Sequence, residues 1–420
     1  MKERFIYIFR LIYKLKDKIA FYPTLISFVG CLFAYLMFYL EEQGISKYLL
    51  ETVPQLVINN TETARSLLTT FIAGLISIMV FSFSMVMILL SQASSNFSPR
   101  LLPGLISNTR HQIVLGIYLS TIIYCIFILV YIEPDGNKYQ LPGFSVLFAI
   151  IFMLNCLAAF IYFIHSISQE IQISNIMQKI FKTSKKRLEI LIENEDEGDD
   201  IKEFENTENW NCYKSNISGY LQDVSLTNIA KITKEIDAKI KIIPIKGTFV
   251  LKENDLFKSN VKLKDEEIEK ILKLFAFAKS EMIEDNYALA FKQLTEIAVK
   301  AMSPGINDPG TAINAIDYLT QLFSIRIEKN DVTYTKIDDE IVITMETVSF
   351  KTLLFQVMAA LRTYCKHDII LVQKLLVMLT SLKNTCTNEN YKKVIINEIE
   401  QLKIDAKSSI KNERDLASIK

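Results

Sequence analysis

Hydroxyl side chains recur at every seventh position of a long apolar run in this sequence. Counted from Thr63 in TARSLLTTFIAGLISIMVFSFSMVMILLSQASSNFSPR, residues 63, 70, 77, 84, 91 and 98 are all Thr or Ser. A seven-residue step turns an α-helix by about 700°, some 20° short of two turns, so these hydroxyls form one slowly drifting stripe. Hydroxyls solvate ions of either sign weakly, and in a membrane helix they can also bond back to their own backbone.

Two interpretations of this stripe remain open. In the first, a homo-oligomer encloses a water-filled path in which hydroxyls replace part of an ion's hydration shell, and Phe81 or Ile88 forms a constriction that gates by dewetting. The predicted pore-lining residues are Thr70, Ser77, Phe81, Ser84, Ile88 and Ser91. In the second, the stripe and the adjacent Gly74 form a seam between closely packed helices. No Asp, Glu, Lys, Arg or His lies between Leu67 and Ser98, which argues against a proton relay or a charge-coupled transporter.

Polar residues and one cation follow the apolar run, where a proline should end the helix. The predicted cytoplasmic mouth consists of Gln92, Asn96, Ser98 and Arg100. Arg100 could attract anions or phospholipid headgroups, and its plainer interpretation is a positive anchor at the membrane edge.

The stretch AMSPGINDPGTA is the second motif with a definite shape. Pro304 and Gly305 end one helix, and Asp308 followed by Pro309 is typical of an N-cap with proline in the first helical position. The predicted ligand or coupling turn comprises Ser303, Gly305, Asn307, Asp308 and Thr311. Free amides at a helix start can hold an anion, but the Asp308 carboxylate would occupy them and repel a phosphate. A structural turn that couples the soluble part to assembly is the favoured interpretation.

Enzyme chemistry finds little support in these residues. Among three histidines, only His367 lies in the predicted soluble part, and its neighbour Asp368 is more typical of a helix start than of acid/base catalysis. No GxSxG or GxxxxGK[ST] motif occurs. The six cysteines are scattered without metal-ligand spacing, so we expect no metal, cofactor or disulfide. Zero net charge, with basic residues at membrane edges, argues against nucleic acid as a partner.

The elements that carry the stripe are predicted from hydropathy. The chain is 50% hydrophobic over 420 residues, with a mean hydropathy of +0.22. The excess lies in four apolar segments, at Phe21–Leu40, Leu68–Leu90, Ile113–Ile132 and Phe144–Ile164. Each has about 20 residues, enough to cross a hydrocarbon core of about 30 Å as a helix. The N-terminal stretch, the second connection and the stretch after the fourth segment together carry thirteen Lys and Arg near the membrane, whereas the first and third connections carry three. Because basic residues favour the cytoplasmic side, this difference predicts that both termini face the cytoplasm.

The remaining chain is predicted to fold as a cytosolic domain, α/β and mainly helical. Residues 166–208 form an amphipathic stretch, and the acidic run ENEDEGDD within them is interpreted as a solvated linker. Residues 209–263 form a small α/β module, in which KIKIIPIKGTFVLKEND alternates as two paired strands around a glycine turn. Residues 264–420 are mainly helical: one helix continues through Phe275, DVTYTKIDDEIVITME forms a hairpin, and three helices start at Phe350, Asp368 and Glu389.

Two stretches carry a resemblance to a known family. ARSLLTTFIAGLISIMVFSFSMVMILLSQASSNFSPRLL and AFKQLTEIAVKAMSPGINDPGTAINAIDYL are similar to the signature of a widespread bacterial family of predicted membrane proteins of unknown function. The resemblance covers nearly the whole chain. It implies a multi-pass protein of the bacterial inner membrane and supplies no activity.

Together these features predict four transmembrane helices and a C-terminal cytosolic domain. The favoured function is an oligomeric channel or pore gated by that domain, with the lipid bilayer, further copies of the chain and inorganic ions as partners. The alternative is a membrane-anchored scaffold or sensor without transport activity.

Overall fold

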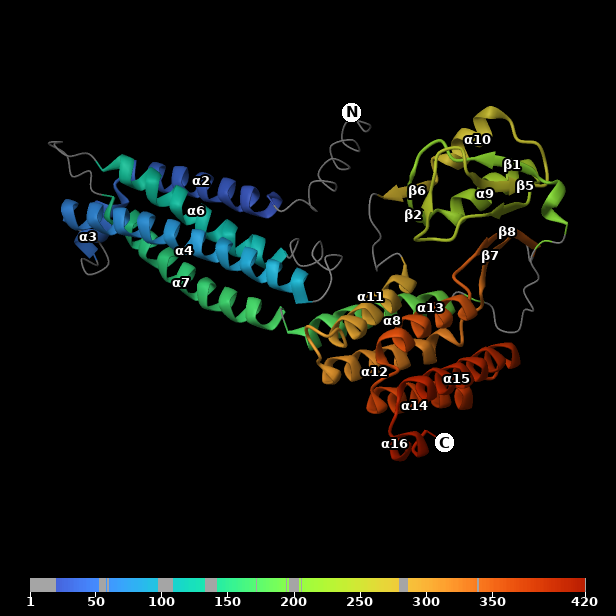
Figure 1. The fold of residues 1–420 in the computed structure, drawn as a ribbon. Coiled ribbons are helices and arrows are strands. Elements are labelled where there is room, and N and C mark those ends of the chain that lie inside the picture. Colours follow the sequence, from blue (N-terminus) through green and yellow to red (C-terminus); the bar gives the residue numbers. More distant parts are fainter. Residues whose placement is uncertain are drawn as a thin grey trace. The chain divides into compact units, whose positions relative to one another are not determined.

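The computed structural model divides the chain into two compact units, Met1–Gln172 and Ile173–Lys420. We call them the membrane-helix unit and the C-terminal unit, and each is described by itself (Figure 1). The structure describes residues 20–52, 58, 60–96, 109–132, 142–170, 172–193, 195, 204, 206–278, 286–337 and 340–419.

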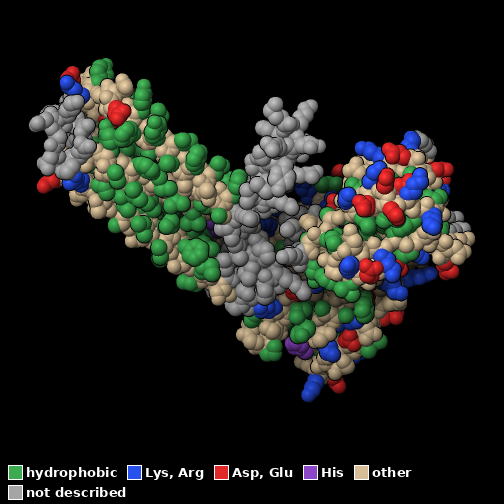
Figure 2. Space-filling view, turned by 90° about the horizontal axis from the view of Figure 1, so that it is seen from above, with side chains coloured by type: hydrophobic (Ala, Val, Ile, Leu, Met, Phe, Trp, Pro, Cys, Tyr) green, Lys and Arg blue, Asp and Glu red, His purple; other side chains and the backbone are tan. Residues whose placement is uncertain are grey.

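The four predicted apolar segments all form helices. The membrane-helix unit contains α2 (Phe21–Glu42), α3 (Ile45–Thr52), α4 (Thr61–Asn96), α6 (Thr109–Tyr131) and α7 (Gly143–Glu170). Four of these, α2, α4, α6 and α7, are long and apolar enough to cross a membrane, which confirms the predicted spans. Figure 2 shows hydrophobic side chains along the visible face of the membrane-helix unit, with charged side chains gathered at one end of that unit.

Helix α6 is the centre of the membrane-helix unit, because it packs on α2, α4 and α7. Its contact with α2 depends on two glycines: a Cβ at Gly30 would lie 2.1 Å from Ser120 Oγ, and one at Gly116 would lie 2.8 Å from Ile26 Cδ1. Lipid tails are as apolar as the helices, so close packing through small residues holds such a pair together. Helices α6 and α4 differ in burial: 44% of the apolar 18-residue stretch of α6 is buried, but only 11% of the corresponding stretch of α4. Helix α4 is therefore mostly exposed.

Polar contacts tie the helix ends of this unit to one another. The Glu41 carboxylate at the end of α2 accepts hydrogen bonds from Ser145 N at 2.9 Å and Ser145 Oγ at 2.6 Å, at the start of α7. Arg65 Nη2 on α4 donates to Ile132 O, just after α6, at 3.2 Å. These contacts satisfy amides and carbonyls that helix ends leave without partners.

Helices make up most of the C-terminal unit. They are α8 (Ile173–Glu193), α9 (Leu226–Ile236), α10 (Asp265–Leu272), α11 (Tyr287–Ala301), α12 (Pro309–Arg326), α13 (Phe350–Cys365), α14 (Ile369–Thr385), α15 (Glu389–Ser409) and α16 (Glu413–Ala417), with a 3₁₀ turn at Thr207–Asn209. The predicted starts of the last three long helices are confirmed: Ser349, Asp368 and Asn388 cap them by accepting hydrogen bonds from backbone amides. Helix α8 packs on α11 and α12 and so belongs to this bundle.

Two sheets form the α/β part of the C-terminal unit. The strands are β1 (Asn211–Lys214), β2 (Gly219–Val224), β3 (Ile240–Ile242), β4 (Phe249–Val250), β5 (Asp255–Ser259), β6 (Phe275–Ala278), β7 (Val332–Ile337) and β8 (Glu340–Glu346). Their orders are β1-β5-β3-β8-β7 and β4-β2-β6. The two sheets and α9 enclose a buried core that includes Ile240, Phe257 and Ile343.

Strand pairing differs from the sequence prediction in two places. The predicted pair around Gly247 is wrong, because β3 pairs with β5 and β8 whereas β4 pairs with β2. The helix predicted through Phe275 ends at Leu272, and Phe275 begins β6, where it is buried beside β2. Alternating apolar residues identify a strand, but partner strands are chosen by which faces can be buried together. The predicted hairpin is confirmed as β7–β8, and it extends the first sheet through β3.

Candidate functional site

The hydroxyl stripe lies on the face of α4 that is turned away from the rest of the membrane-helix unit. Thr70, Ser77, Ser84 and Ser91 are all exposed. The residues of α4 buried in the unit are Ala64, Leu68, Leu75 and Ser82. The last three are also seven residues apart, so a buried row of two leucines and a serine and an exposed hydroxyl row run along different sides of one helix.

Hydrogen bonding within α4 makes exposed hydroxyls tolerable in an apolar surrounding. Thr70 Oγ1 donates to Ser66 O at 2.7 Å, and Ser77 Oγ donates to Ala73 O at 2.9 Å. These two hydroxyl donors are therefore satisfied within the helix, while each oxygen keeps lone pairs that can accept a further hydrogen bond. Such a row can accept hydrogen bonds from water or contact a cation without a charged side chain.

The predicted constriction shares the exposed face of the stripe. Phe81 is 55% exposed and Ile88 is 65% exposed. Ile88 follows Thr70 by five full helical turns at about 100° per residue, so the two side chains point in the same direction. Phe81 also meets the ring of Phe160 on α7 edge to face, with centroids 6.1 Å apart. Apolar side chains at Ile76, Val80 and Phe83 are exposed as well. The exposed face of α4 is therefore broad, with a hydroxyl side and a purely apolar side.

The predicted mouth falls at the limit of what the structure describes. Gln92 and Asn96 belong to the last turns of α4, but their side chains lie outside the described residues, as do Ser98 and Arg100 altogether. The mouth stays a prediction.

The predicted N-cap of the second motif is confirmed. Asp308 Oδ1 accepts from Thr311 N at 3.0 Å and Asp308 Oδ2 accepts from Thr311 Oγ1 at 2.6 Å, with Pro309 in the first position of α12. Asn307 takes the left-handed conformation, with φ 49°, and Ser303 Oγ donates to Lys300 O at 2.7 Å. Gly305 is exposed. Because both carboxylate oxygens are used, the geometry favours a structural turn, and a ligand or coupling role stays a prediction.

Replacing Asp308 by alanine should lower the melting temperature of the C-terminal unit, at a cost of about 1 kcal/mol for a lost N-cap. The hydrogen bonds from Thr311 lower the pKa of Asp308, so the cap contributes stability at neutral pH and loses it as the pH falls through this lowered pKa. Thermal unfolding of the full chain in detergent, measured at neutral and acid pH, checks both statements. Equal melting temperatures of the two proteins at neutral pH would refute the capping role.

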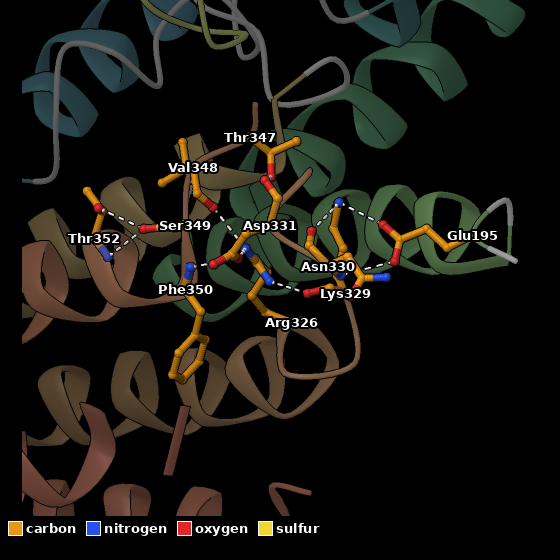
Figure 3. A network of polar contacts seen from close by, with 10 residues as sticks. All are labelled: Glu195, Arg326, Lys329, Asn330, Asp331, Thr347, Val348, Ser349, Phe350 and Thr352. Atoms are coloured by element: carbon orange, nitrogen blue, oxygen red, sulfur yellow. Dashed lines mark hydrogen bonds and ion pairs between the residues drawn. The ribbon is translucent and has the colours of Figure 1, made fainter. Parts of the chain in front are cut away.

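A network of buried charges, missed in the sequence, joins the end of α12 to β7 and α13 (Figure 3). The Arg326 side chain is 0% exposed and forms an ion pair with Asp331. Its guanidinium also donates to Lys329 O at 2.7 Å and to Val348 O at 2.8 Å. Asp331 Oδ1 in turn accepts from Phe350 N at 2.9 Å. Arg326 thus links the end of α12 to the residues that precede β7 and α13.

Lys329 extends this network to the segment after α8. Its side chain is 0% exposed, and Nζ donates to Glu195 Oε1 and to Asn330 O, each at 2.8 Å. Glu195 Oε2 accepts from Asn330 N at 3.0 Å. Burial lowers the pKa of Lys329, and Glu195 opposes that effect. The interpretation of the acidic run as a solvated linker is therefore wrong at Glu195; residues 194 and 196–200 lie outside the described part of the chain.

Helix α8 is fixed to the C-terminal unit along its length. Phe181 packs against Tyr318 of α12 with ring centroids 5.3 Å apart, and Ser184 Oγ donates to Tyr287 O of α11 at 3.3 Å. Beyond the last residue of α8, Glu195 accepts a hydrogen bond from Lys329. In the sequence only two residues separate α8 from membrane helix α7. The amphipathic spacing of α8 and the charges in SIRIEKND are the signals in the sequence that could have indicated these contacts.

Comparison with known proteins places the chain in a family. Residues 16–381 match the family model of DUF2254, described as a predicted membrane protein. The chain belongs to this family. Uncharacterized proteins of Mycobacterium bovis and Mycobacterium tuberculosis are each 24% identical to it over 369 residues, which are 85% of this chain and 70% of theirs. No solved structure matches it.

The His367–Asp368 pair, the other candidate for chemistry in this DUF2254 protein, contributes a helix cap. Asp368 caps α14 by accepting from Ile370 N at 2.9 Å and from Leu371 N at 3.2 Å, as expected of a helix start. Among the described residues, no group of three or more His, Cys, Asp or Glu could hold a metal ion. The stripe on α4 is exposed and has no structural role in the described part of the chain beyond hydrogen bonds within its own helix.

Proposed function

We propose that this DUF2254 protein is an oligomeric, non-enzymatic channel or pore whose α4 helices line a path for inorganic ions. It works in the bacterial inner membrane with both termini in the cytoplasm, and its partners are the lipid bilayer and further copies of the chain. The observation that carries the proposal is the row of exposed hydroxyls on α4.

The length of the row supports a path through the whole membrane. Thr70 and Ser91 are 21 residues apart in one continuous helix, which corresponds to about 32 Å at 1.5 Å per residue. The hydrocarbon core is about 30 Å thick. Hydroxyls that faced only lipid would gain nothing from their outward position, whereas α4 helices from several copies around one axis would bring the rows to a shared interior.

The chemistry of the row supports weak selectivity. No ionisable side chain occurs on α4 between Leu67 and Asn96, so hydroxyl oxygens and apolar rings would be the lining groups. Phe81 and Ile88 interrupt the hydroxyls with bulky apolar side chains, as a hydrophobic gate requires. We propose that α8 transmits the state of the C-terminal unit to α7, because α8 is anchored by Phe181, Ser184 and the Glu195 segment.

Cysteine accessibility on α4 tests this proposal. In a chain whose six native cysteines are replaced, cysteines at Thr70, Ser77 and Ser84 should react from water with small polar thiol reagents, and modification should reduce ion flux in liposomes. Reaction needs the thiolate, which forms only where water reaches. Cysteines at Ile76 and Phe83 are matched controls, because these positions are also exposed but each lies about 100° around the helix from the neighbouring stripe residue.

The same experiment decides between the pore and the scaffold. If the stripe positions react no faster than the controls and the purified protein passes no ions, then the hydroxyls form a dry helix-packing seam. The proposal would then be wrong, and the membrane-anchored scaffold or sensor would take its place.

A further inference from the structure

One face of α8 is strongly basic and exposed. Its opposite face is buried in the C-terminal unit through Ile176, Met177, Ile180, Ser184 and Leu188. The exposed face carries Lys179, Lys182, Lys185 and Lys186. All four ammonium groups lie on one side of the helix. Lys186 follows Lys179 by seven residues, or about two turns, and Lys182 and Lys185 lie at intermediate positions.

Acidic residues do not neutralise this face. No Asp or Glu occurs from Ser174 to Leu188. Lys185 pairs with Glu189 at 3.6 Å, with both side chains about half exposed, so it remains largely available. Among the residues that the structure describes, Lys179, Lys182 and Lys186 have no acidic partner. We call these four lysines the basic face of α8.

In the sequence, the basic face closely follows a helix long and apolar enough to cross a membrane. Helix α7 ends at Glu170 and α8 begins at Ile173, and the apolar part of α7 gives way to the polar residues HSISQE at 165–170. Lys179 lies about 9 Å along α8 from its first residue. The Debye length is about 8–10 Å at physiological salt, so a lipid surface attracts all four lysines when α8 lies along it.

We propose that the basic face of α8 binds the headgroups of anionic phospholipids in the bilayer that α7 crosses. Clustered lysines that directly follow a membrane helix suit this partner, because an ammonium is a compact point charge on a flexible stem and needs no fixed geometry. The buried face holds α8 in the C-terminal unit, so lipid binding also fixes that unit at the membrane surface. This inference does not depend on pore activity.

A lipid titration of the full chain tests the inference. A fluorophore on a cysteine at Gln178, an exposed position beside Lys179, is placed in a chain without native cysteines and held in micelles of an uncharged detergent. Spin-labelled phosphatidylglycerol should quench it at low concentration, and spin-labelled phosphatidylcholine should not. Each lysine is expected to contribute about fivefold to the affinity near a charged surface.

Matched triple variants distinguish lipid binding at the basic face of α8 from a general effect of the protein's net charge. K179Q/K182Q/K186Q should weaken the apparent affinity for phosphatidylglycerol about 100-fold, whereas K393Q/K407Q/K411Q, with the same loss of charge on and just after α15, should leave it unchanged. Equal affinities in the two variants would overturn the proposal, as would equal quenching by the two lipids. Soluble glycerol phosphate should not compete; full competition would mean that the lysines bind a free anion rather than a membrane.

Discussion

Replacing Arg326 by methionine should lower the free energy of unfolding of the C-terminal unit by about 3 kcal/mol, the low end of the range for a buried ion pair that loses one partner, because the Asp331 side chain is 32% exposed. Methionine keeps much of the volume but removes every donor. Asp331 would lose its buried cation, and the carbonyls of Lys329 and Val348 would lose the hydrogen bonds that Arg326 makes at 2.7 and 2.8 Å. Unpaired buried polar groups account for most of the expected cost.

The single tryptophan of the chain offers a selective readout of this change. Trp210 lies just before β1 and packs against Phe204 with ring centroids 5.1 Å apart, so its fluorescence reports on the C-terminal unit during denaturant unfolding of the full chain. Lys374→Met is the matched control, because Lys374 pairs with Asp317 at 2.5 Å but both side chains are partly exposed. Its expected cost is below about 1 kcal/mol. If Arg326→Met cost no more than this control, the network would not hold α12, β7 and α13 together.

Replacing Phe81 or Ile88 by serine should raise ion leak through the reconstituted protein by about tenfold or more. A serine hydroxyl wets the predicted constriction, and each 1.4 kcal/mol removed from a barrier increases the rate about tenfold. Both side chains lie on the exposed face of α4 that carries the hydroxyl stripe. Efflux of a small ion from liposomes, compared at equal protein content, gives the measurement.

Phe83→Ser is the matched control for this prediction. Phe83 is 57% exposed, close to the 55% of Phe81, but at about 100° per residue it points some 140° away from Thr70. The same chemical change there should leave the leak at its basal level. A leak that rose equally in Phe81→Ser and Phe83→Ser would point to general disturbance of α4, and no rise at Phe81 or Ile88 would remove the proposed gate.

Local patterns were sufficient to predict the elements whose formation depends on neighbours in the sequence. Apolar runs of about 20 residues predicted the four membrane helices, and Asp308 with Pro309 predicted the start of α12. The seven-residue period of α4 likewise predicted that Thr70 and Ser91 share one side of the helix. Each of these results depends on helix periodicity or on a cap within three residues, which a sequence displays directly.

The tertiary structure decided which of these faces are covered and which distant groups meet. It turned Leu68 and Leu75 of α4 inward and the hydroxyl stripe outward, it paired β3 with β8, and it brought Glu195 to Lys329 across 134 residues. The residues next to a strand or a charged side chain in the sequence do not indicate which distant group it will pair with. A buried charge is tolerated only where the assembled fold supplies an opposite charge and hydrogen bonds, so the pairing is settled by the packing of α8, α12 and β7 together.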